Sequence, residues 1–484
     1  MRGEGTGEKR ALILGTGKNV PAVREGVEHR LMTQRRGGES KKTPARRGIS
    51  RRGFLKMSGA GLAGAALLGA AGCGGGGGPE RAEDGSILFT FSFGVDPSGT
   101  LQELVKRFNQ KYEGRYTANY REMGVDYLND LRTELQAGGG EIALIGGDVI
   151  WPAELAANDW IVDLSERFPE SERKKFLDSP IQANIYEGKI YGVPWFTDAG
   201  MLYYRKDLLQ KSGFSEAPKT WDELKEMAEK VMQDEGVQNG FVFQGSNYEG
   251  GVVDGLEFIN SHGGSVLAEN DPSRVVIGGS DSVAGLATEQ SMVADGIAPQ
   301  SVAQYTETES QATFLNGDAV FLRNWPAVYA LAADPEQSKI KQDQISVAPL
   351  PAGSGPNGKS VSGLGGWSFL INAAMDEETQ DAAWKFVEFA SAPEQQKFRA
   401  IEGGFLPTLK ALYDDRDVLD AVPVIKLAPE VLSRTVPRPV SPYYSDMSLE
   451  MAAQFNDSLN GETTPAKAVK TLQEELQNIA EQTS

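Results

Sequence analysis

The 484-residue sequence contains very little cysteine and histidine. Cys73 is its one cysteine, and His29 and His262 are its two histidines. A single cysteine cannot form an intrachain disulfide bond or a cysteine-rich metal site. Two histidines argue against a histidine-based zinc centre or a catalytic triad. We therefore expect no metal or other cofactor, and the residue sets that many hydrolases use are missing.

Positive charge is also scarce outside the N-terminal region. Residues 1–72 carry 15 Lys or Arg and 5 Asp or Glu, whereas residues 73–484 carry 33 and 62, so the latter part has a net charge of −29. Such a surface repels phosphate groups, and we expect no nucleic-acid partner. The length predicts at least two compact parts, because a domain usually has roughly 100–200 residues. No repeat of 20–50 residues is visible, which argues against solenoids and propellers.

The basic leader, residues 1–72, has the pattern of an export signal. Residues 50–56 (SRRGFLK) contain paired arginines and run into an almost uncharged segment of Gly, Ala and Leu at residues 57–72. This order is typical of a twin-arginine signal peptide. The alternative, a transmembrane helix, fails on length, since spanning needs about 20 strongly apolar residues. We interpret residues 1–49 as disordered or as an over-extended translation start.

Cys73 ends the apolar segment in the sequence LLGAAGC, which resembles a bacterial lipobox. In a lipobox the chain is cleaved before the cysteine, which then carries the lipid; Ala70 stands where Leu is commoner. The alternative is a small buried cysteine. Residues 74–78 are all glycine, however, and indicate a flexible tether over residues 73–85. We therefore predict a lipid-anchored protein on the outer face of the cytoplasmic membrane.

The exported body has the alternating pattern of an α/β protein. Short apolar runs predict strands at residues 87–91, 141–150, 241–243, 319–322 and 345–348. Amphipathic spacing predicts helices at residues 101–112, 221–233, 377–391, 393–401 and 465–481. Thr220 and Glu223 have the spacing of a capping box at the start of one helix. The pattern predicts mixed sheets with flanking helices, in two lobes with a cleft between them.

Several separated sequence motifs resemble those of the solute-binding proteins of ABC sugar importers, in particular the trehalose- and maltose-binding branch. The resemblance covers most of residues 86–484 and rests on residues 147–151 (GDVIW), 191–209 (YGVPWFTDAGMLYYRKDLL), 314–319 (FLNGDA), 323–326 (RNWP), 363–367 (GLGGW) and 438–447 (RPVSPYYSDM). It implies the type II-like periplasmic-binding-protein fold, whose chain crosses three times between two lobes. On this analogy residues 86–196 and 346–392 form lobe one, and residues 199–343 and 396–484 form lobe two. Hinges are then expected near Asp198, Gln344 and Pro393.

The resemblance also implies the residues that hold the sugar. Trp325 and Trp367 match sugar-stacking tryptophans, although a tryptophan is more often a core residue. Asp148 and Asp198 match hydroxyl acceptors, for which the alternatives are a helix N-cap and a hinge hydrogen bond. Gly365 and Gly366 could let the backbone approach a ligand or could form a turn. Phe196 stands where some relatives have tyrosine.

Three charged residues complete the predicted site. Glu307 could bind a second sugar ring, but its neighbour Glu309 competes for that role and a solvated helix face is an equal alternative. Arg438 resembles an arginine that donates to sugar oxygens, with a structural salt bridge as its alternative. Glu249 is a weaker candidate. We expect Trp151, Trp160 and Trp195 to pack in the core and His262 to lie in a turn without chemistry.

The sequence therefore predicts binding without catalysis. A monomer would capture a disaccharide or related α-glucoside by cleft closure and deliver it to ABC permease subunits with their ATPase. An exported glycoside hydrolase or transferase remains an alternative, because Asp148 with Asp198 or Glu307 could supply a carboxylate pair. A binding protein for another neutral solute is the third reading.

Overall fold

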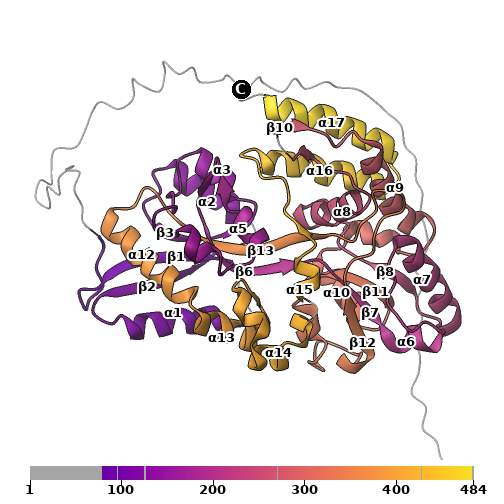
Figure 1. Ribbon diagram of the computed structural model, residues 1–484, viewed down its shortest axis with the longest axis horizontal. Helices are drawn as coiled ribbons and strands as arrows, with labels where there is room; N and C mark the ends of the chain where they lie inside the picture. Colours follow the sequence, from indigo (N-terminus) through magenta and orange to yellow (C-terminus); the bar gives the residue numbers. More distant parts are fainter. Residues whose placement is uncertain are drawn as a thin grey trace, which may run out of the picture. The chain divides into compact units, whose positions relative to one another are not determined.

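The computed structural model describes residues 79–481 except 95, 97, 125, 126, 270 and 427. The predicted leader, the lipobox with Cys73 and the glycines of the tether lie outside the described residues. In the described part we find no helix with the length and apolarity that crossing a membrane requires. The elements of this part are shown in Figure 1.

The larger sheet has seven strands, of which six follow the order β14, β6, β13, β3, β1, β2. Their bounds are Leu406–Pro407 (β14), Val193–Ala199 (β6), Ser362–Ile371 (β13), Ile142–Asp148 (β3), Ile87–Phe93 (β1) and Tyr116–Glu122 (β2), and the seventh strand is Thr435–Val436 (β15), paired with β13. β1 is parallel to β2 and β3, whereas β13 is antiparallel to β3 and β6. The sheet is therefore mixed, as the sequence predicts.

A second mixed sheet has four strands in the order β12, β7, β11, β8. They comprise Ile345–Ala348 (β12), Met201–Arg205 (β7), Ala319–Asn324 (β11) and Asn239–Val242 (β8). Two small antiparallel pairs are formed by β4 (Ile185–Tyr186) with β5 (Lys189–Ile190) and by β9 (Leu267–Ala268) with β10 (Asp271–Val275). The mixed α/β class is confirmed.

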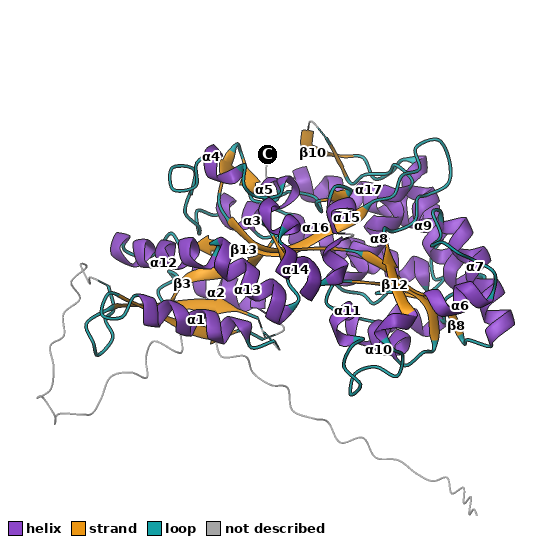
Figure 2. Ribbon diagram, turned by 60° about the horizontal axis from the view of Figure 1, so that its bottom comes forward, coloured by secondary structure: helices purple, strands orange, loops and turns teal. Residues whose placement is uncertain are grey.

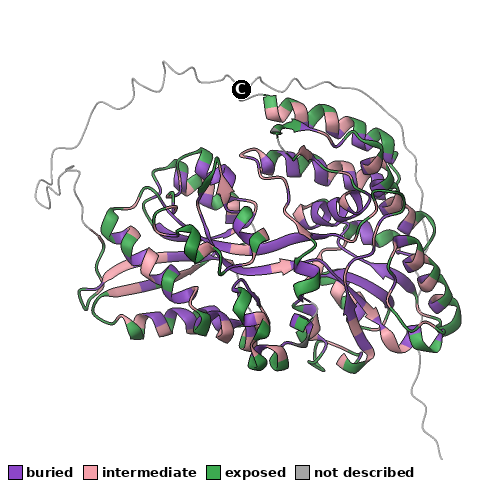
Figure 3. Cartoon of the chain, in the orientation of Figure 1, coloured by how far each residue is buried: buried purple, intermediate pink, exposed green. Residues whose placement is uncertain are grey.

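Helices flank the strands of both sheets, as Figure 2 shows. The helices within residues 100–182 and 377–403 are α1 (Thr100–Lys111), α2 (Tyr127–Gln136), α3 (Pro152–Ala157), α4 (Glu170–Arg173), α5 (Asp178–Gln182), α12 (Glu377–Ala390) and α13 (Pro393–Gly403). The others are α6 (Lys206–Lys211), α7 (Trp221–Glu235), α8 (Glu249–Ser261), α9 (Ser280–Ala294), α10 (Glu307–Leu315), α11 (Val328–Leu331), α14 (Arg416–Ala421), α15 (Ala428–Leu432), α16 (Tyr444–Leu459) and α17 (Pro465–Glu481). Figure 3 shows that the strands are largely buried, while the helices present exposed residues on their outer sides.

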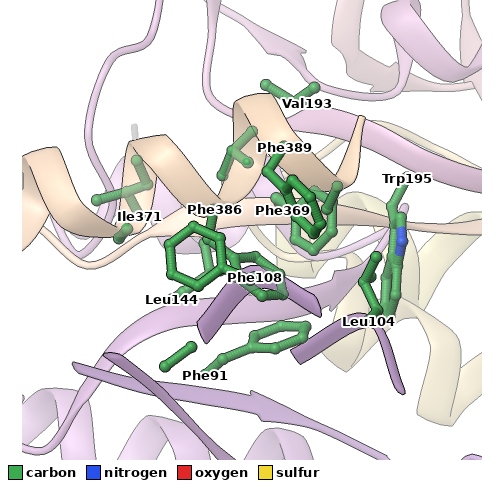
Figure 4. Close-up of a cluster of buried hydrophobic side chains, with 14 of the residues drawn as sticks. Phe91, Leu104, Phe108, Leu144, Val193, Trp195, Phe369, Ile371, Phe386 and Phe389 are labelled. Carbon is green, nitrogen blue, oxygen red and sulfur yellow. The ribbon is translucent and has the colours of Figure 1, made fainter. Parts of the chain in front are cut away.

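The first core explains why α1 forms where it does. Its apolar positions Leu101, Leu104, Val105 and Phe108 recur at helical spacing and are all buried. Phe108 meets the ring of Phe386 of α12 at a centroid distance of 5.0 Å. Figure 4 shows the same cluster continuing into β1, β13 and Trp195. Burial of such aromatic side chains, about 1.5–3 kcal/mol each, holds α1 and α12 on the sheet.

The N-terminus of α7 differs slightly from its prediction. The Thr220 hydroxyl accepts a hydrogen bond from the Glu223 amide at 3.1 Å, which is the predicted cap. The Glu223 carboxylate, however, accepts from the amide of Lys219 at 2.6 Å instead of that of Thr220. The reciprocal bond of the capping box is therefore shifted by one residue.

The chain passes directly from one sheet to the other at Gly200. β6 ends at Ala199 in the larger sheet and β7 begins at Met201 in the smaller one. A side chain at Gly200 would collide with the Glu257 carboxylate and lie 2.7 Å from Arg323 Nη2. Glycine is needed here because the crossing strand runs against a buried ion pair.

The observed sheets differ from the predicted lobe division in two places. Residues 346–348, assigned to lobe one, lie in β12 and pair with β7, so the chain leaves the smaller sheet after Ala348 instead of at Gln344. Leu406 and Pro407, assigned to lobe two, pair with β6 in the larger sheet. Strand propensity predicts that a segment is extended, but the choice of partner depends on distant residues. The remaining division into lobes and hinges stays a prediction.

Candidate ligand-binding cleft

A cavity of about 660 Å³ lies where elements of both sheets meet. Its size falls within the usual range of small-molecule sites, about 300–1,000 Å³. All ten residues predicted to bind the ligand line it: Asp148, Phe196, Asp198, Glu249, Glu307, Trp325, Gly365, Gly366, Trp367 and Arg438. The structure thus brings residues of five of the six motifs to one place, together with Glu249 and Glu307.

The floor of the cavity is built by β6, β13 and β3. β13 places Trp367 opposite Asp148 of β3 and opposite Phe196 of β6, and Gly365 opposite Asp198. The register of β13 with β6 shifts between Trp367 and Ser368, which leaves Trp195 as an extra residue. Such a bulge changes which face a side chain points to. Phe196 and Asp198 consequently line the cavity, while Trp195 is buried in the core.

The two glycines before Trp367 are required by close neighbours in the protein. A Cβ at Gly365 would lie 2.9 Å from the Trp325 ring and 3.1 Å from Asp198 Cβ. Gly366 has a φ of 117°, and a Cβ there would collide with the carbonyl of Phe196. Gly365 therefore lets Trp325 of the smaller sheet approach the floor of the cavity, and Gly366 lets β13 lie close to β6.

Trp325 and Trp367 are both partly buried and lie on the cavity wall. Trp325 follows β11, and its indole Nε1 donates to Glu307 Oε1 at 3.3 Å. The guanidinium of Arg323 lies 4.2 Å from the centroid of its ring. Trp367 packs edge to face on Phe93 and Trp151, at 4.9 and 5.3 Å. Both indoles are thus held in fixed orientations by neighbours outside the cavity.

Asp148 and Glu249 share the guanidinium of Arg438. Arg438 Nη2 donates to Asp148 Oδ1 at 2.9 Å and Nη1 donates to Glu249 Oε1 at 2.5 Å. Glu249 also accepts hydrogen bonds from the hydroxyls of Tyr444, at 2.7 Å, and Ser448. Burial raises the pKa of Asp148 and Arg438 opposes this shift. Arg438 therefore makes the salt bridge that is the alternative interpretation, and it also lines the cavity.

Asp198 is the contrasting carboxylate. Its side chain is partly buried, and no hydrogen-bond donor within the described residues contacts it. Its pKa is raised from 3.8 to about 7, mainly by burial and also by the charge of Asp148, while the charge of Arg399 acts in the opposite direction. A partly buried acceptor without a partner is costly in the free protein, because its hydration is lost without replacement. It is suited to accept a hydrogen bond from a ligand.

Glu307 and Glu309 have separate roles. Glu307 lines the cavity, where its Oε2 accepts from the hydroxyl of Tyr248 at 2.7 Å. Glu309 is exposed and forms a capping box with Thr306 at the start of α10. Of the two acidic neighbours, Glu307 is therefore the one that a ligand could reach.

Several residues that the sequence did not single out also line the cavity. They include Tyr248, Val253, Ala327, Leu331 and Phe405. Tyr248 precedes Glu249 directly and could have been inferred from that motif, whereas Phe405 follows a helix and carries no local signal. Within the described range no group of three or more His, Cys, Asp or Glu residues could hold a metal ion.

His262 and the remaining tryptophans lie outside this cavity. His262 is buried in the turn after α8, where Nδ1 lies 2.9 Å from the Phe258 carbonyl oxygen and Nε2 lies 3.1 Å from the Thr288 hydroxyl. Trp151 and Trp195 are buried in hydrophobic cores, and Trp160 packs against one of them. The three tryptophans have the packing roles that the sequence predicts, and His262 lies in the predicted turn.

Substitution of Asp198 by Asn should raise the free energy of unfolding at neutral pH. Because the pKa of Asp198 is about 7 in the folded protein and 3.8 ordinarily, the unfolded chain loses its proton first as the pH rises, and the folded state is penalised progressively from about pH 4 to about pH 7. Asparagine does not titrate, so the stability gain of the variant should grow over this interval and then stay constant. Urea unfolding at pH values of about 4, 6 and 8 measures it. A difference between the two proteins that does not change with pH would contradict this prediction.

Comparison with known proteins places this site in a family. The family described as bacterial extracellular solute-binding protein matches residues 94–397. A probable ABC transporter-binding protein from Deinococcus radiodurans is 37% identical over 69% of this chain and 78% of its own length. The maltose-bound structure of T. maritima MalE3 is 36% identical, covers 81% of this chain and 99% of its own, and has a TM-score of 0.73. The maltotriose-binding protein of Pyrococcus abyssi is 24% identical over 61% of each chain. The chain therefore belongs to the bacterial extracellular solute-binding proteins of ABC transporters.

Proposed function

We propose that the chain is the extracytoplasmic carbohydrate-binding subunit of an ABC importer. Its ligand is a disaccharide or related α-glucoside of the trehalose or maltose type. The observation that carries this proposal is the pairing of two tryptophans on one cavity: Trp325 follows a strand of the smaller sheet and Trp367 lies in a strand of the larger one. Asp198, whose carboxylate has no hydrogen-bond donor among the residues that the structure describes, lines the same cavity.

The chemistry of a pyranose suits this arrangement. Its C–H faces are apolar and can stack on an indole, while its hydroxyls donate to carboxylates. Asp198 and Glu307 supply acceptors, and Arg438 supplies a donor to ring or hydroxyl oxygens. The relative from T. maritima binds maltose in its structure and the one from Pyrococcus abyssi is a maltotriose-binding protein. Both support an α-glucoside for this chain.

Capture proceeds by closure of the cleft. Trp325 directly follows a strand of the smaller sheet, and Trp367 lies in a strand of the larger one. A sugar that contacts both indoles therefore favours the closed arrangement by the contacts it gains there. The crossing at Gly200 and the segment between β12 and β13 absorb the rotation. The closed monomer then docks on the permease subunits, which release the sugar with the help of the ATPase.

Export and anchoring follow from the N-terminal sequence. The twin-arginine signal directs the chain across the cytoplasmic membrane, and lipidation of Cys73 holds it at the outer face. The tether is shorter than the predicted residues 73–85, because residues 80–85 turn back and pair with the start of β1 through Arg81 and Ile87. The five glycines at residues 74–78 would let the body reach the permease.

We propose that the site does not catalyse glycoside cleavage. The family consists of solute-binding proteins rather than enzymes. A glycosidase needs one carboxylic acid and one free carboxylate around the scissile bond. Asp148 is engaged by Arg438, and Glu307 is engaged by Tyr248 and Trp325. These contacts favour carboxylates that accept hydrogen bonds in fixed positions over a pair that reacts with a glycosidic bond. The alternative to a sugar is another neutral solute as the ligand.

The ligand class is tested by calorimetric titration of the mature protein with maltose, trehalose and sucrose, alongside an amino acid and a peptide. We expect heat and 1:1 binding with at least one of the disaccharides. Incubation with the bound sugar should release no glucose. Absence of heat with all three disaccharides would refute the proposed ligand, and sustained glucose release would refute the binding-only function.

Replacing Trp325 by Ala should weaken sugar binding by at least about tenfold, which is about 1.4 kcal/mol, because a stacking surface in the cleft is lost. Trp384→Ala is the matched control, since Trp384 lies on α12 beside a different cavity. The affinity of the Trp384→Ala variant for the sugar should equal that of the wild type. Equal affinity of the Trp325 variant would exclude a stacking role for this residue.

Substitution of Cys73 by Ser should release the protein from the membrane, because serine cannot form the thioether to a lipid. Fractionation of cells that express the full chain, followed by mass measurement of the mature N-terminus, tests this. We expect the wild type in the membrane fraction with a lipid mass on Cys73. An unmodified Cys73 in the wild type would refute the anchor without affecting the ligand assignment.

A further inference from the structure

Arg399 lies immediately behind the aromatic wall of the cleft. It belongs to α13 and is 2% exposed. Its guanidinium is 3.9 Å from the ring centroid of Trp195 and 4.0 Å from that of Phe405, with Phe196 at 5.2 Å. Phe196 and Phe405 face the cavity, and their rings lie 4.8 Å apart. The cation is therefore stacked between the core and the two phenyl rings that a ligand would meet.

The same guanidinium contacts the loop that follows β1. Arg399 Nε donates to the Thr100 hydroxyl at 3.3 Å, and Nη2 lies 3.7 Å from Asp96 Oδ2. Asp96 caps α1: it accepts hydrogen bonds from the amides of Leu101, at 2.8 Å, and Ser98, at 3.0 Å. Asp96 and Ser98 line the cavity. Arg399 thus joins three parts of the cleft wall, namely this loop, β6 and the segment after α13.

The charge of Arg399 is incompletely paired by these contacts. Its Nη1 and Nη2 are buried and have no hydrogen-bond partner within the described residues. Asp96 is the carboxylate near it, and the second anion that affects its pKa is Asp198, which lies two positions after Phe196 on β6 and lines the same cavity. Burial lowers the pKa of Arg399 to about 9, and Asp96 and Asp198 oppose this shift, so the guanidinium is charged at neutral pH.

Such a group is not needed for packing alone. A buried ion can often be replaced by apolar side chains of similar volume without loss of stability. Methionine has a similar reach without the charge, so it is the apolar replacement for Arg399 beside these rings. The benefit of the charge therefore has to come from the groups that it faces.

We propose that Arg399 is a positioning residue of the cleft, which holds the Phe196–Phe405 wall by stacking. It also provides the counter-charge for the carboxylate of Asp198, the residue two positions after Phe196 on β6, which receives a ligand hydroxyl. This inference rests on the proposed function for the identity of the ligand. The other charged group that faces Asp198 is Asp148 on β3, whose charge is offset by Arg438 at 2.9 Å. The charge of Asp198 also acts on the hydroxyls of Tyr203 and Tyr413; both are neutral at neutral pH, and burial raises the pKa of each further above its ordinary value.

The test compares Arg399→Met and Arg399→Gln with Arg399→Lys, which keeps the charge. Maltose affinity is measured by calorimetry between about pH 5 and about pH 9. In the wild type, affinity should fall as the pH drops through about 7, where Asp198 takes up a proton. Loss of the cation should move this midpoint upward by about half to one pH unit and weaken binding at pH 7 several-fold. Arg399→Lys should keep the midpoint of the wild type.

The control is Lys397→Met on the same helix. Lys397 pairs with Asp415 and Asp417 away from the cleft, so removal of its charge should leave the midpoint unchanged. A merely structural role for Arg399 predicts weaker binding at every pH with the same midpoint, in the lysine variant too. That outcome would overturn the proposal.

A second measurement needs no ligand. Urea unfolding gives the free energy of unfolding of each Arg399 variant, with and without the additional Asp198→Asn substitution, as a function of pH. The difference between the two free energies reports the titration of Asp198 itself. The pH midpoint of this titration should be higher in Arg399→Met and Arg399→Gln than with Arg399 in place. Either variant serves if the other does not fold. An unchanged midpoint refutes the role of Arg399. If the midpoint rises while the wild type binds no sugar, only the proposed ligand is wrong.

Discussion

The arrangement of the cleft depends on the register of one strand, β13. This strand pairs with β3 and β6 at once and sets Trp367 opposite Asp148 and Phe196, with Gly365 opposite Asp198. Neighbouring strands lie about 4.8 Å apart, so residues from three distant motifs come within one cross-strand distance. A slip of one residue would turn every side chain of β13 to the opposite face. The two glycines contribute to this register, because any larger residue would push the strand away from β6 or from Trp325.

Three buried arginines offset the acidic groups around the cleft. Arg438 pairs with Asp148 and Glu249, and Arg399 lies near Asp96. Arg323 is held by both oxygens of Glu257, at 2.6 and 2.7 Å, and covers one face of Trp325. Glu257 also accepts from the amide of Gly363 in β13 at 2.8 Å. The support of the Trp325 ring is thus connected to the strand that carries Trp367, so the two aromatic surfaces share one framework.

The features that could be predicted from the sequence are those that depend on residues close together in the chain. Helical spacing predicted α1, α7, α12 and α17 nearly to their ends, and the ten candidate ligand-binding residues all line the cavity. It could not decide between roles that depend on distant partners. Arg438 and Asp148 are 290 positions apart, and whether their bond exists is a property of the fold. Phe405 and Arg399 have no pattern of their own, because their contacts are made with β6 and α1. The boundary at β12 was misplaced for the same reason.

The two aspartates of the cavity floor, Asp148 and Asp198, differ in their hydrogen-bond partners. Asp148 has an arginine and a backbone amide as partners, so it is satisfied in the free protein. Asp198 has no donor in the described part of the chain. A buried acceptor with a structural role normally has a partner, because leaving it unpaired costs about 1–3 kcal/mol. A ligand hydroxyl that binds Asp198 would remove this cost, whereas one that binds Asp148 would have to compete with Arg438. These contacts are the physical reason for proposing Asp198 as the residue that gains a partner in the bound state and Asp148 as part of the framework of the cleft.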